Sequence, residues 1–248
     1  KVDTTYTPEI VPVTPTATPA ETTDIQGATQ TGKPEFKGGT VTVDGVEKTV
    51  PINEDVPATF EDGSTTKTVE GVGTYTVAAD GTVTFVPEKS FVGTAPAVTV
   101  VREDKNGTKA SATYTPTVTP VTPTATPVET TDIQGATQTG KPVFTEGDSR
   151  VPMDDDTPAT FEDGSTTKTI PGEGTYTVAP DGTVTFVPEK SFTGTGTGVT
   201  VKRVDKNGTP VTAKYTPTVT PVTPTAEDVT STDKQGQTQT GKPKFTEG

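Results

Sequence analysis

Residues 73–87 read Gly73-Thr-Tyr-Thr-Val-Ala-Ala-Asp80-Gly81-Thr-Val-Thr-Phe-Val-Pro87, and this stretch returns almost unchanged as residues 174–188. Apolar and threonine side chains alternate on both sides of the Asp-Gly pair, so tyrosine, valine and phenylalanine share one parity. Because successive side chains of a strand point to opposite faces, this alternation predicts a β-hairpin with one buried face. Such a hairpin needs a second sheet to cover that face. The stretch therefore predicts an all-β fold of two packed sheets.

The whole chain is repetitive, and the hairpin is one part of a longer period. The tripeptide Tyr-Thr-Pro begins at Tyr6, Tyr114 and Tyr215, which lie 108 and 101 residues apart. From Phe60 onward the first two copies keep the spacing of 101 residues. About seven short strands per period, separated by turn signals, are typical of a β-sandwich. The sequence therefore predicts tandem β-sandwich (Ig-like) repeat domains joined end to end by Pro/Thr-rich linkers.

The strands and core of the first repeat follow from the same alternation. We expect one strand over residues 29–36, then strands at 58–60 and 65–69, the hairpin of 73–87, and a closing pair at 97–103 and 109–118. Asn106-Gly107 in the closing pair predicts a two-residue type I′ turn. Asp44-Gly45 predicts a small extra hairpin, at the place where the first copy is seven residues longer than the second. The residues expected in the core are Tyr75, Val77, Val83, Phe85, Phe91, Val98, Val100 and Tyr114.

The domain boundaries are placed at the proline-rich segments. A proline every three or so residues disfavours a central strand and favours a stiff, extended spacer. On this basis residues 1–19 are the end of a preceding repeat and its linker, 20–119 the first repeat domain, 120–127 a linker, 128–220 the second repeat domain, and 221–248 a linker with the partial start of a third repeat. A cut near Gly147, which would assign the Gln-Thr-Gly-Lys-Pro segment to the preceding unit, is an alternative.

Composition and charge argue against several classes of function. The formal net charge of -13 disfavours nucleic acid and anionic membranes as partners, and no hydrophobic span predicts membrane insertion. Cysteine and histidine are absent, which removes disulfides, thiolates and the usual general base. The leucine-free composition leaves disorder as an alternative, but the ordered alternation favours folded domains with thin cores and marginal stability. We expect no enzyme, no catalytic residue and no cofactor.

One acidic loop is a candidate metal site. Asp154, Asp155 and Asp156 are consecutive, and calcium prefers six to eight oxygen ligands in clustered loops. The chain has no Asp-x-Asp-x-Asp-Gly loop, so a solvated acidic loop that keeps the surface soluble is the favoured interpretation. We therefore expect no metal, with calcium at this loop as the alternative. A glycosidase acid/base pair is a further interpretation, but adjacent exposed carboxylates lack the apolar pocket that would raise one pKa.

Three lysines recur in one sequence context, Gly-Lys-Pro, at Lys33, Lys141 and Lys242. Surface modules of Gram-positive bacteria sometimes crosslink a buried lysine to an asparagine or aspartate, so a crosslink is one hypothesis. The simpler interpretation is a surface residue at the end of a strand.

The hairpin, followed by Phe91-Val-Gly93-Thr94, Val98-Thr-Val and Asp104-Lys-Asn-Gly, resembles the CshA-type fibril repeat of streptococcal and related Gram-positive surface adhesins. The resemblance covers essentially the whole chain. It implies an extracellular, cell-wall-anchored fibril in which many tandem repeats form a stalk. It also implies a separate N-terminal adhesive region and, for the whole adhesin, a host matrix partner such as fibronectin. The chain carries neither a secretion signal nor a sorting motif, as expected for a fragment of the repeat array.

Two functions are compatible with these observations. The first is a structural stalk or spacer, in which each repeat has the adjacent repeats of the same chain as partners and adds length. The alternative is that the repeats are themselves weak multivalent binding modules for host matrix protein or sister fibrils. A binding face is expected to expose aromatic or arginine side chains, whereas parity assigns most aromatic residues to the cores. This favours the spacer.

Overall fold

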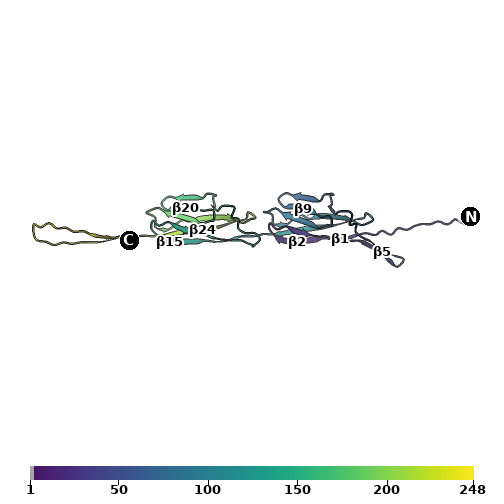
Figure 1. Ribbon diagram of the computed structural model, residues 1–248, viewed down its shortest axis with the longest axis horizontal. Helices are drawn as coiled ribbons and strands as arrows, with labels where there is room; N and C mark the ends of the chain where they lie inside the picture. The colour runs from purple at the N-terminus through teal and green to yellow at the C-terminus, as the bar shows by residue number, and fades with distance from the viewer. Residues whose placement is uncertain (1–2) are drawn as a thin grey trace. The chain divides into compact units, whose positions relative to one another are not determined.

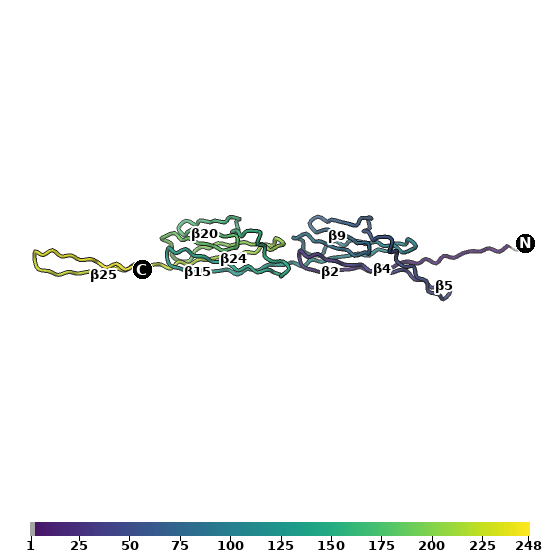
Figure 2. The backbone as a smooth tube through the Cα atoms, viewed as in Figure 1, coloured from purple at the N-terminus to yellow at the C-terminus, as the bar shows by residue number. Residues whose placement is uncertain are grey.

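Threonine and valine favour extended backbone, and every regular element of the protein is a strand. The computed structural model describes residues 3–248 (Figures 1 and 2), which divide into unit 1, up to Thr122, and unit 2, from Pro123 onward. No helix occurs in this part of the chain. The prediction of an all-β chain with tandem repeats is confirmed.

Unit 1 contains two packed sheets and two small hairpins. Its strands are β1 (Thr16–Thr18), β2 (Ala20–Ile25), β3 (Gln30–Gly32), β4 (Glu35–Lys37), β5 (Gly39–Val43), β6 (Val46–Val50), β7 (Thr59–Phe60), β8 (Thr66–Val69), β9 (Gly73–Val77), β10 (Val83–Pro87), β11 (Gly93–Thr94), β12 (Val98–Glu103) and β13 (Lys109–Thr119). The first sheet has the order β3-β10-β9-β8, and the second has β11-β13-β12-β7 with β2 also paired to β13. The predicted hairpin of residues 73–87 is β9-β10, in the first sheet.

Unit 2 repeats this arrangement without the β5-β6 hairpin. Its strands are β14 (Thr124–Thr126), β15 (Val128–Ile133), β16 (Gln138–Gly140), β17 (Val143–Thr145), β18 (Thr160–Phe161), β19 (Thr167–Ile170), β20 (Gly174–Val178), β21 (Val184–Pro188), β22 (Gly194–Thr195), β23 (Val199–Val204), β24 (Pro210–Thr220), β25 (Thr225–Glu227) and β26 (Lys244–Thr246). One sheet has the order β16-β21-β20-β19, and the other contains β15, β24, β23, β18 and β22. β25 and β26 form a separate antiparallel pair.

An 11-residue strand, β13 in unit 1 and β24 in unit 2, organises the second sheet of each unit. In unit 1, β12 pairs antiparallel with β13 over Lys109–Tyr114, and β2 runs parallel to β13 over Tyr114–Thr119. In unit 2, β24 pairs in the same two ways with β23 and β15. The sequence did not predict β2, because Ala-Glu-Thr-Thr-Asp-Ile shows no apolar alternation. β2 and β13 of unit 1 therefore run in the same direction, side by side, and so do β15 and β24 of unit 2.

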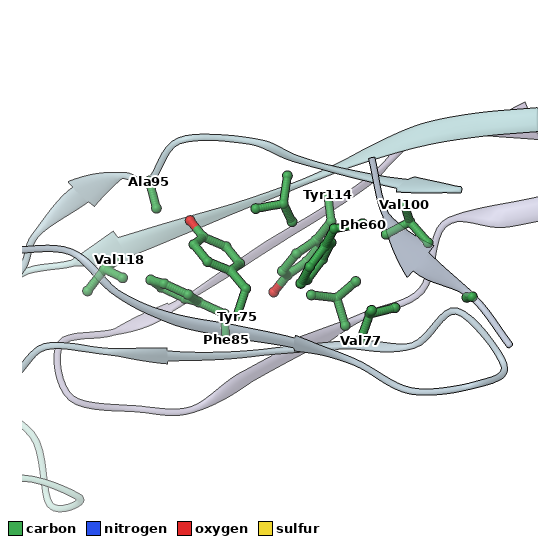
Figure 3. Packing of buried hydrophobic residues seen from close by; sticks show 11 residues of the cluster. Phe60, Tyr75, Val77, Phe85, Ala95, Val100, Tyr114 and Val118 are labelled. Atoms are coloured by element: carbon green, nitrogen blue, oxygen red, sulfur yellow. The ribbon is translucent and has the colours of Figure 1, made fainter. Parts of the chain in front are cut away.

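The core lies between the two sheets and combines aromatic rings with valine and alanine side chains. All of the expected core residues of unit 1 are buried except Phe91, which is half-buried against the same cluster. Tyr75 and Phe85 have ring centroids 4.6 Å apart, and Figure 3 shows them beside Phe60 and Tyr114 in that cluster. Fully burying an aromatic side chain contributes roughly 1.5–3 kcal/mol to folding. These rings therefore replace the leucines that a core of this size usually contains.

The turn of the extra hairpin has the predicted geometry. Asp44 and Gly45 have φ angles of 51° and 77°, and Val43 pairs directly with Val46. Positive φ at both central residues is the requirement of a type I′ turn. The Asp44-Gly45 prediction is therefore confirmed.

The prediction of a two-residue turn at Asn106-Gly107 is wrong. Asp104 is fully buried, and its Oδ1 accepts hydrogen bonds from the backbone N–H groups of Asn106 and Thr108 at 2.9 and 2.8 Å. Of the two residues Asn106 and Gly107, only Gly107 has a positive φ, of 81°, whereas a type I′ turn needs a positive φ at both. The residue pair of β12 and β13 nearest the turn is Glu103 with Lys109, so the connection is longer than two residues. The Asp104 side chain thus stabilises a longer connection between two strands that are hairpin partners as predicted.

The segment of residues 29–36 forms two strands and not the one that was expected. β3 pairs with β10 in the first sheet, whereas β4 pairs with β1 outside it. Pro34 stands between the two strands and has no backbone N–H to donate to a ladder. The chain therefore leaves the first sheet at this proline.

The proline-rich segments also contain short strands. Within the predicted linker 120–127, β14 pairs with β17 of unit 2. In the same unit β16, which belongs to the Gln-Thr-Gly-Lys-Pro segment, pairs with β21. That segment is thus hydrogen-bonded to a strand that follows it in unit 2, whereas the alternative cut near Gly147 would assign it to the preceding unit. The domain limits at 20–119 and 128–220 stay a prediction.

Candidate functional site

The predicted calcium ligands lie in the loop before β18. Lys206 Nζ is 2.5 Å from Asp154 Oδ1 and 2.7 Å from Asp156 Oδ2, and the Arg203 guanidinium is 2.7 Å from Asp155 Oδ1. The hydrogen bond from Lys206 holds the pKa of Asp154 at about 2. Two cations therefore already compensate the three carboxylates, and calcium would have to displace Lys206. In residues 3–248 no group of three or more acidic side chains is arranged to hold a metal ion. The expectation of no metal, with calcium at this loop as the alternative, stays a prediction.

A cleft of about 600 Å³ opens beside the equivalent loop of unit 1. Phe36, Lys33 and Asp80 line one part of it, and Glu54 and Arg102 line another. The Arg102 side chain is only 7% exposed, and its guanidinium contacts Glu54 Oε2 at 2.9 Å. Lys33 likewise pairs with Asp80. The charges of the cleft are thus largely compensated by one another.

The lysines of the crosslink hypothesis form surface ion pairs. Lys33 Nζ lies 2.8 Å from Asp80 Oδ2, Lys141 Nζ lies 2.9 Å from Asp181 Oδ2, and all four side chains are about half exposed. The hydrogen bond from Lys141 lowers the pKa of Asp181 to about 2. A nucleophilic lysine requires a desolvated amine, which neither pair provides. Lys242 is also exposed, in the segment between β25 and β26. This geometry favours the interpretation as surface residues.

Each unit contains a buried polar network that sequence analysis did not predict. Gln30 is 4% exposed; its Oε1 accepts from Thr22 Oγ1 at 2.6 Å, and its Nε2 donates to the Thr117 carbonyl at 2.9 Å. The Tyr114 hydroxyl lies 2.7 Å from Thr22 Oγ1. Gln138 is the centre of the same network in unit 2. These side chains join the first sheet to the two parallel strands of the second.

The repeated segment Thr-Gln-Thr-Gly contained the signal for this network. Its glutamine recurs at the same position of each copy, as Gln30, Gln138 and Gln239. Its glycine is also needed, because a Cβ on Gly32 would lie 2.2 Å from the ring of Tyr114. A buried amide packed against a buried tyrosine explains both residues.

A second buried polar group distinguishes unit 2 from unit 1. Glu173 is 6% exposed in the turn before β20, where unit 1 has Val72. In unit 1, burial raises the pKa of Tyr75 to about 12, and its hydroxyl donates to the Pro96 carbonyl at 2.8 Å. In unit 2 the equivalent Tyr176 donates to Glu173.

The charged groups described above form ion pairs at the surface, and the buried polar groups form hydrogen bonds between the two sheets of a unit. The fold defines the chain as a tandem array of β-sandwich repeats. The sequence pattern of the protein family described as "Surface adhesin CshA repetitive domain" matches this chain twice, over residues 12–118 and 120–219. The chain belongs to this family of adhesin repeats, which is non-enzymatic in kind.

Several solved structures are similar to this chain. The NMR structure of repeat domain 13 of the fibrillar adhesin CshA from Streptococcus gordonii is 67% identical, and the match covers 28% of this chain and 90% of that one, with a TM-score of 0.18. The I9-I11 tandem of titin is 11% identical over 84% of this chain and 66% of its own, with a TM-score of 0.34. Mouse cadherin-23 EC22-24 is 13% identical over 85% and 65%, with a TM-score of 0.29. We draw no functional conclusion from the last two. A comparison with curated proteins finds no match.

Family membership implies an extracellular location at a cell surface. Within residues 3–248, no helix has the length and apolarity needed to cross a membrane.

Proposed function

We propose that these repeats are structural spacers in the stalk of a bacterial fibrillar adhesin, and that they hold an N-terminal adhesive region away from the cell wall. The observation that carries this proposal is the parallel pairing of β2 with β13 in unit 1, and of β15 with β24 in unit 2. Because a strand near the start of the sandwich runs parallel to its long closing strand, the chain enters at one end of the sandwich and leaves at the other. An antiparallel pair would bring it back to the same end.

The length gained per unit follows from β13. This strand has 11 residues, and a rise of about 3.3 Å per residue gives it a length of about 36 Å. β1 lies beside β13, and β2 continues along it in the same direction. The chain therefore advances by about this length within the unit. Long tandem arrays of such units would gain reach in proportion to copy number.

The connection after unit 1 is short and constrained. Four residues, 120–123, separate β13 from β14, and two of them are prolines. The backbone N–H of Val121 donates to Gln26 Oε1 at 3.2 Å, and Gln26 Nε2 donates to the Lys89 carbonyl at 2.8 Å. Proline favours extended backbone, and the Gln26 contacts fix the direction in which the chain leaves β13. Both features support the spacer.

The outer face of the first sheet lacks the side chains of a typical binding surface. Thr31, Thr84, Thr76 and Thr66 lie in register across its four strands. Binding energy is usually concentrated in tryptophan, tyrosine and arginine. A face of threonine side chains is suited to remaining solvated, which supports a spacer function and not a ligand-binding function.

Solution scattering of this chain beside a version with residues 120–220 duplicated tests the proposal. We expect the maximum dimension to rise by at least about 30 Å, the length of one long strand. Growth of only a few ångströms, as for a compact particle, would overturn the spacer. Micromolar binding of isolated repeats to fibronectin would favour the alternative of weak multivalent modules. Fibronectin binding by the whole adhesin and anchoring to the cell wall are parts of the proposal that family membership supports.

A further inference from the structure

We propose that unit 2 contains an acid-sensitive latch, formed by Glu173, Tyr176 and Thr197, which unit 1 lacks. The latch holds the segment between β22 and β23 against the start of β20. Acidification would release this segment and destabilise unit 2 selectively. This inference is independent of the spacer function, because it concerns the stability of one repeat.

At the centre of the latch, the buried carboxylate of Glu173 accepts three hydrogen bonds. Glu173 Oε1 accepts from the Tyr176 hydroxyl and from the backbone N–H of Thr197, the latter at 2.9 Å. Glu173 Oε2 accepts from Thr197 Oγ1 at 2.7 Å. All three donors are neutral and two come from one residue, so the carboxylate fixes the Thr197 segment both by its backbone and by its side chain.

Unit 1 achieves the same connection without an ionisable acid. Val72 stands in place of the glutamate and packs against the core, and the Tyr75 hydroxyl donates directly to the carbonyl of Pro96. The segment Ala95-Pro96-Ala97 of unit 1 corresponds to Gly196-Thr197-Gly198 of unit 2. The first sheet of each unit is thus joined to this segment through a tyrosine, with different chemistry.

Three of the positions that differ between the units, 173, 196 and 197, depend on one another. A Cβ on Gly196 would lie 2.8 Å from Glu173 Oε1 and 2.6 Å from the Tyr176 hydroxyl oxygen, so alanine does not fit beside the latch. Proline at position 197 would remove the backbone N–H that the carboxylate accepts. The glutamate, glycine and threonine of unit 2 therefore form one set, and the valine, alanine and proline of unit 1 form another.

The surroundings of Glu173 contain no paired cation. Tyr176 on β20 and Tyr215 on β24 are in edge-to-face contact, with ring centroids 6.2 Å apart. Lys214 on β24 lies near Gly198, and Glu189 after β21 accepts from the backbone N–H of Gly172. No ion pair to Glu173 is found in residues 3–248. The charge is therefore stabilised by hydrogen bonds alone.

The direction of the pH effect follows from these contacts. Burial favours the neutral acid and raises the pKa of Glu173, but the bonds from Tyr176 and Thr197 outweigh burial and bring the pKa below its ordinary value of 4.5. An acid with a lowered folded-state pKa stabilises the protein above the unfolded-state pKa, and that stabilisation is lost as the pH falls through the folded-state value. The protonated acid is itself a donor, so it cannot accept all three bonds.

The first test compares the intact chain with Glu173→Gln. Denaturant titrations at pH 7 and pH 3, followed by the amide NMR signals of each unit, give separate midpoints for the two units. Between pH 7 and pH 3, we expect unfolding of wild-type unit 2 to take up more protons than unfolding of the variant does. Its midpoint should therefore fall further on acidification. Parallel falls in both proteins would overturn the latch. The effects of Asp154 and of the other acids on stability cancel in this comparison, because these acids titrate in both the wild-type chain and the variant.

The second test moves the latch into unit 1 and remains decisive if the first variant fails to fold. The changes are Val72→Glu, Ala95→Gly, Pro96→Thr and Ala97→Gly. We expect unit 1 to acquire the acid-dependent fall in midpoint, and unit 2 of the same chain serves as the reference. As a readout on the unmodified protein, the side-chain carboxyl 13C shift of Glu173 should titrate below pH 4.5. Titration at or above that value would also overturn the proposal.

Discussion

The buried glutamine of unit 1 gives the sharpest prediction about stability. Replacing Gln30 by alanine removes the bond accepted from Thr22 and the bond donated to the Thr117 carbonyl, and leaves a gap between the sheets. Losing the bond with Thr22 costs about 1 kcal/mol, because Thr22 keeps the Tyr114 hydroxyl as a partner. Losing the bond to the Thr117 carbonyl costs about 1–3 kcal/mol, because this acceptor loses its side-chain donor in the interior. We therefore expect Gln30→Ala to lower the free energy of unfolding by about 2–4 kcal/mol.

The same chain contains the control. Gln239 occupies the equivalent position in the third copy of the segment, where it is exposed, so Gln239→Ala should leave both units unchanged. For a domain of about 100 residues, 1 kcal/mol corresponds to about 4–8 °C in melting temperature. We expect the transition of unit 1, resolved by its amide NMR signals, to fall by roughly 10–25 °C. Unit 2 should melt as before.

A charged variant separates lost bonding from lost volume. Gln30→Glu preserves the shape and the acceptor for Thr22, but at neutral pH its carboxylate faces the Thr117 carbonyl, which is also an acceptor. Repulsion and burial should raise the folded-state pKa of the introduced acid, so its destabilisation is greatest at pH 7 and is relieved as the pH falls. A melting temperature of unit 1 unchanged by Gln30→Ala would refute the structural role of this network.

Three further predictions concern other contacts. Gly140→Ala would place a Cβ 2.6 Å from the ring of Tyr215, so we expect a loss of about 1–3 kcal/mol in unit 2 by denaturant titration; an unchanged midpoint would show that the ring can move aside. Tyr176→Phe should cost more than Tyr75→Phe, about 2 against about 1 kcal/mol, because only the first leaves a buried carboxylate short of a donor; equal losses would contradict this. Millimolar calcium should leave the melting temperature of unit 2 within about 1 °C, because Lys206 already occupies the acidic loop, and a marked rise that EDTA reverses would instead establish a metal site.

Much of the fold could be predicted because its signals are local. The alternation around Asp80-Gly81 identified the central hairpin and placed Tyr75 and Phe85 in the core, since the period of a strand is two. The turn at Asp44-Gly45 was predicted because both residues tolerate positive φ. Each of these inferences depends on residues within a few positions of one another.

The errors and omissions share a different cause. The Asn106-Gly107 turn differs because the buried Asp104 side chain captures its backbone. The sequence analysis did not single out Glu173. Its burial depends on Thr197, which lies beside it only in the folded unit. In both cases a side-chain contact made on folding outweighs the local preference.

The sequence alone specifies an all-β chain with a period of about a hundred residues, and it identifies the buried side chains of the central hairpin. How each unit is closed depends on contacts that form only in the folded structure. The parallel alignment of Ala20–Ile25 with Lys109–Thr119 joins segments about ninety residues apart, and neither segment encodes the direction or register of its partner. Those are selected when the two sheets pack and the Gln30 amide satisfies groups on both sides. That alignment sends the chain out at the far end of the unit, which is the geometric basis of the proposed spacer.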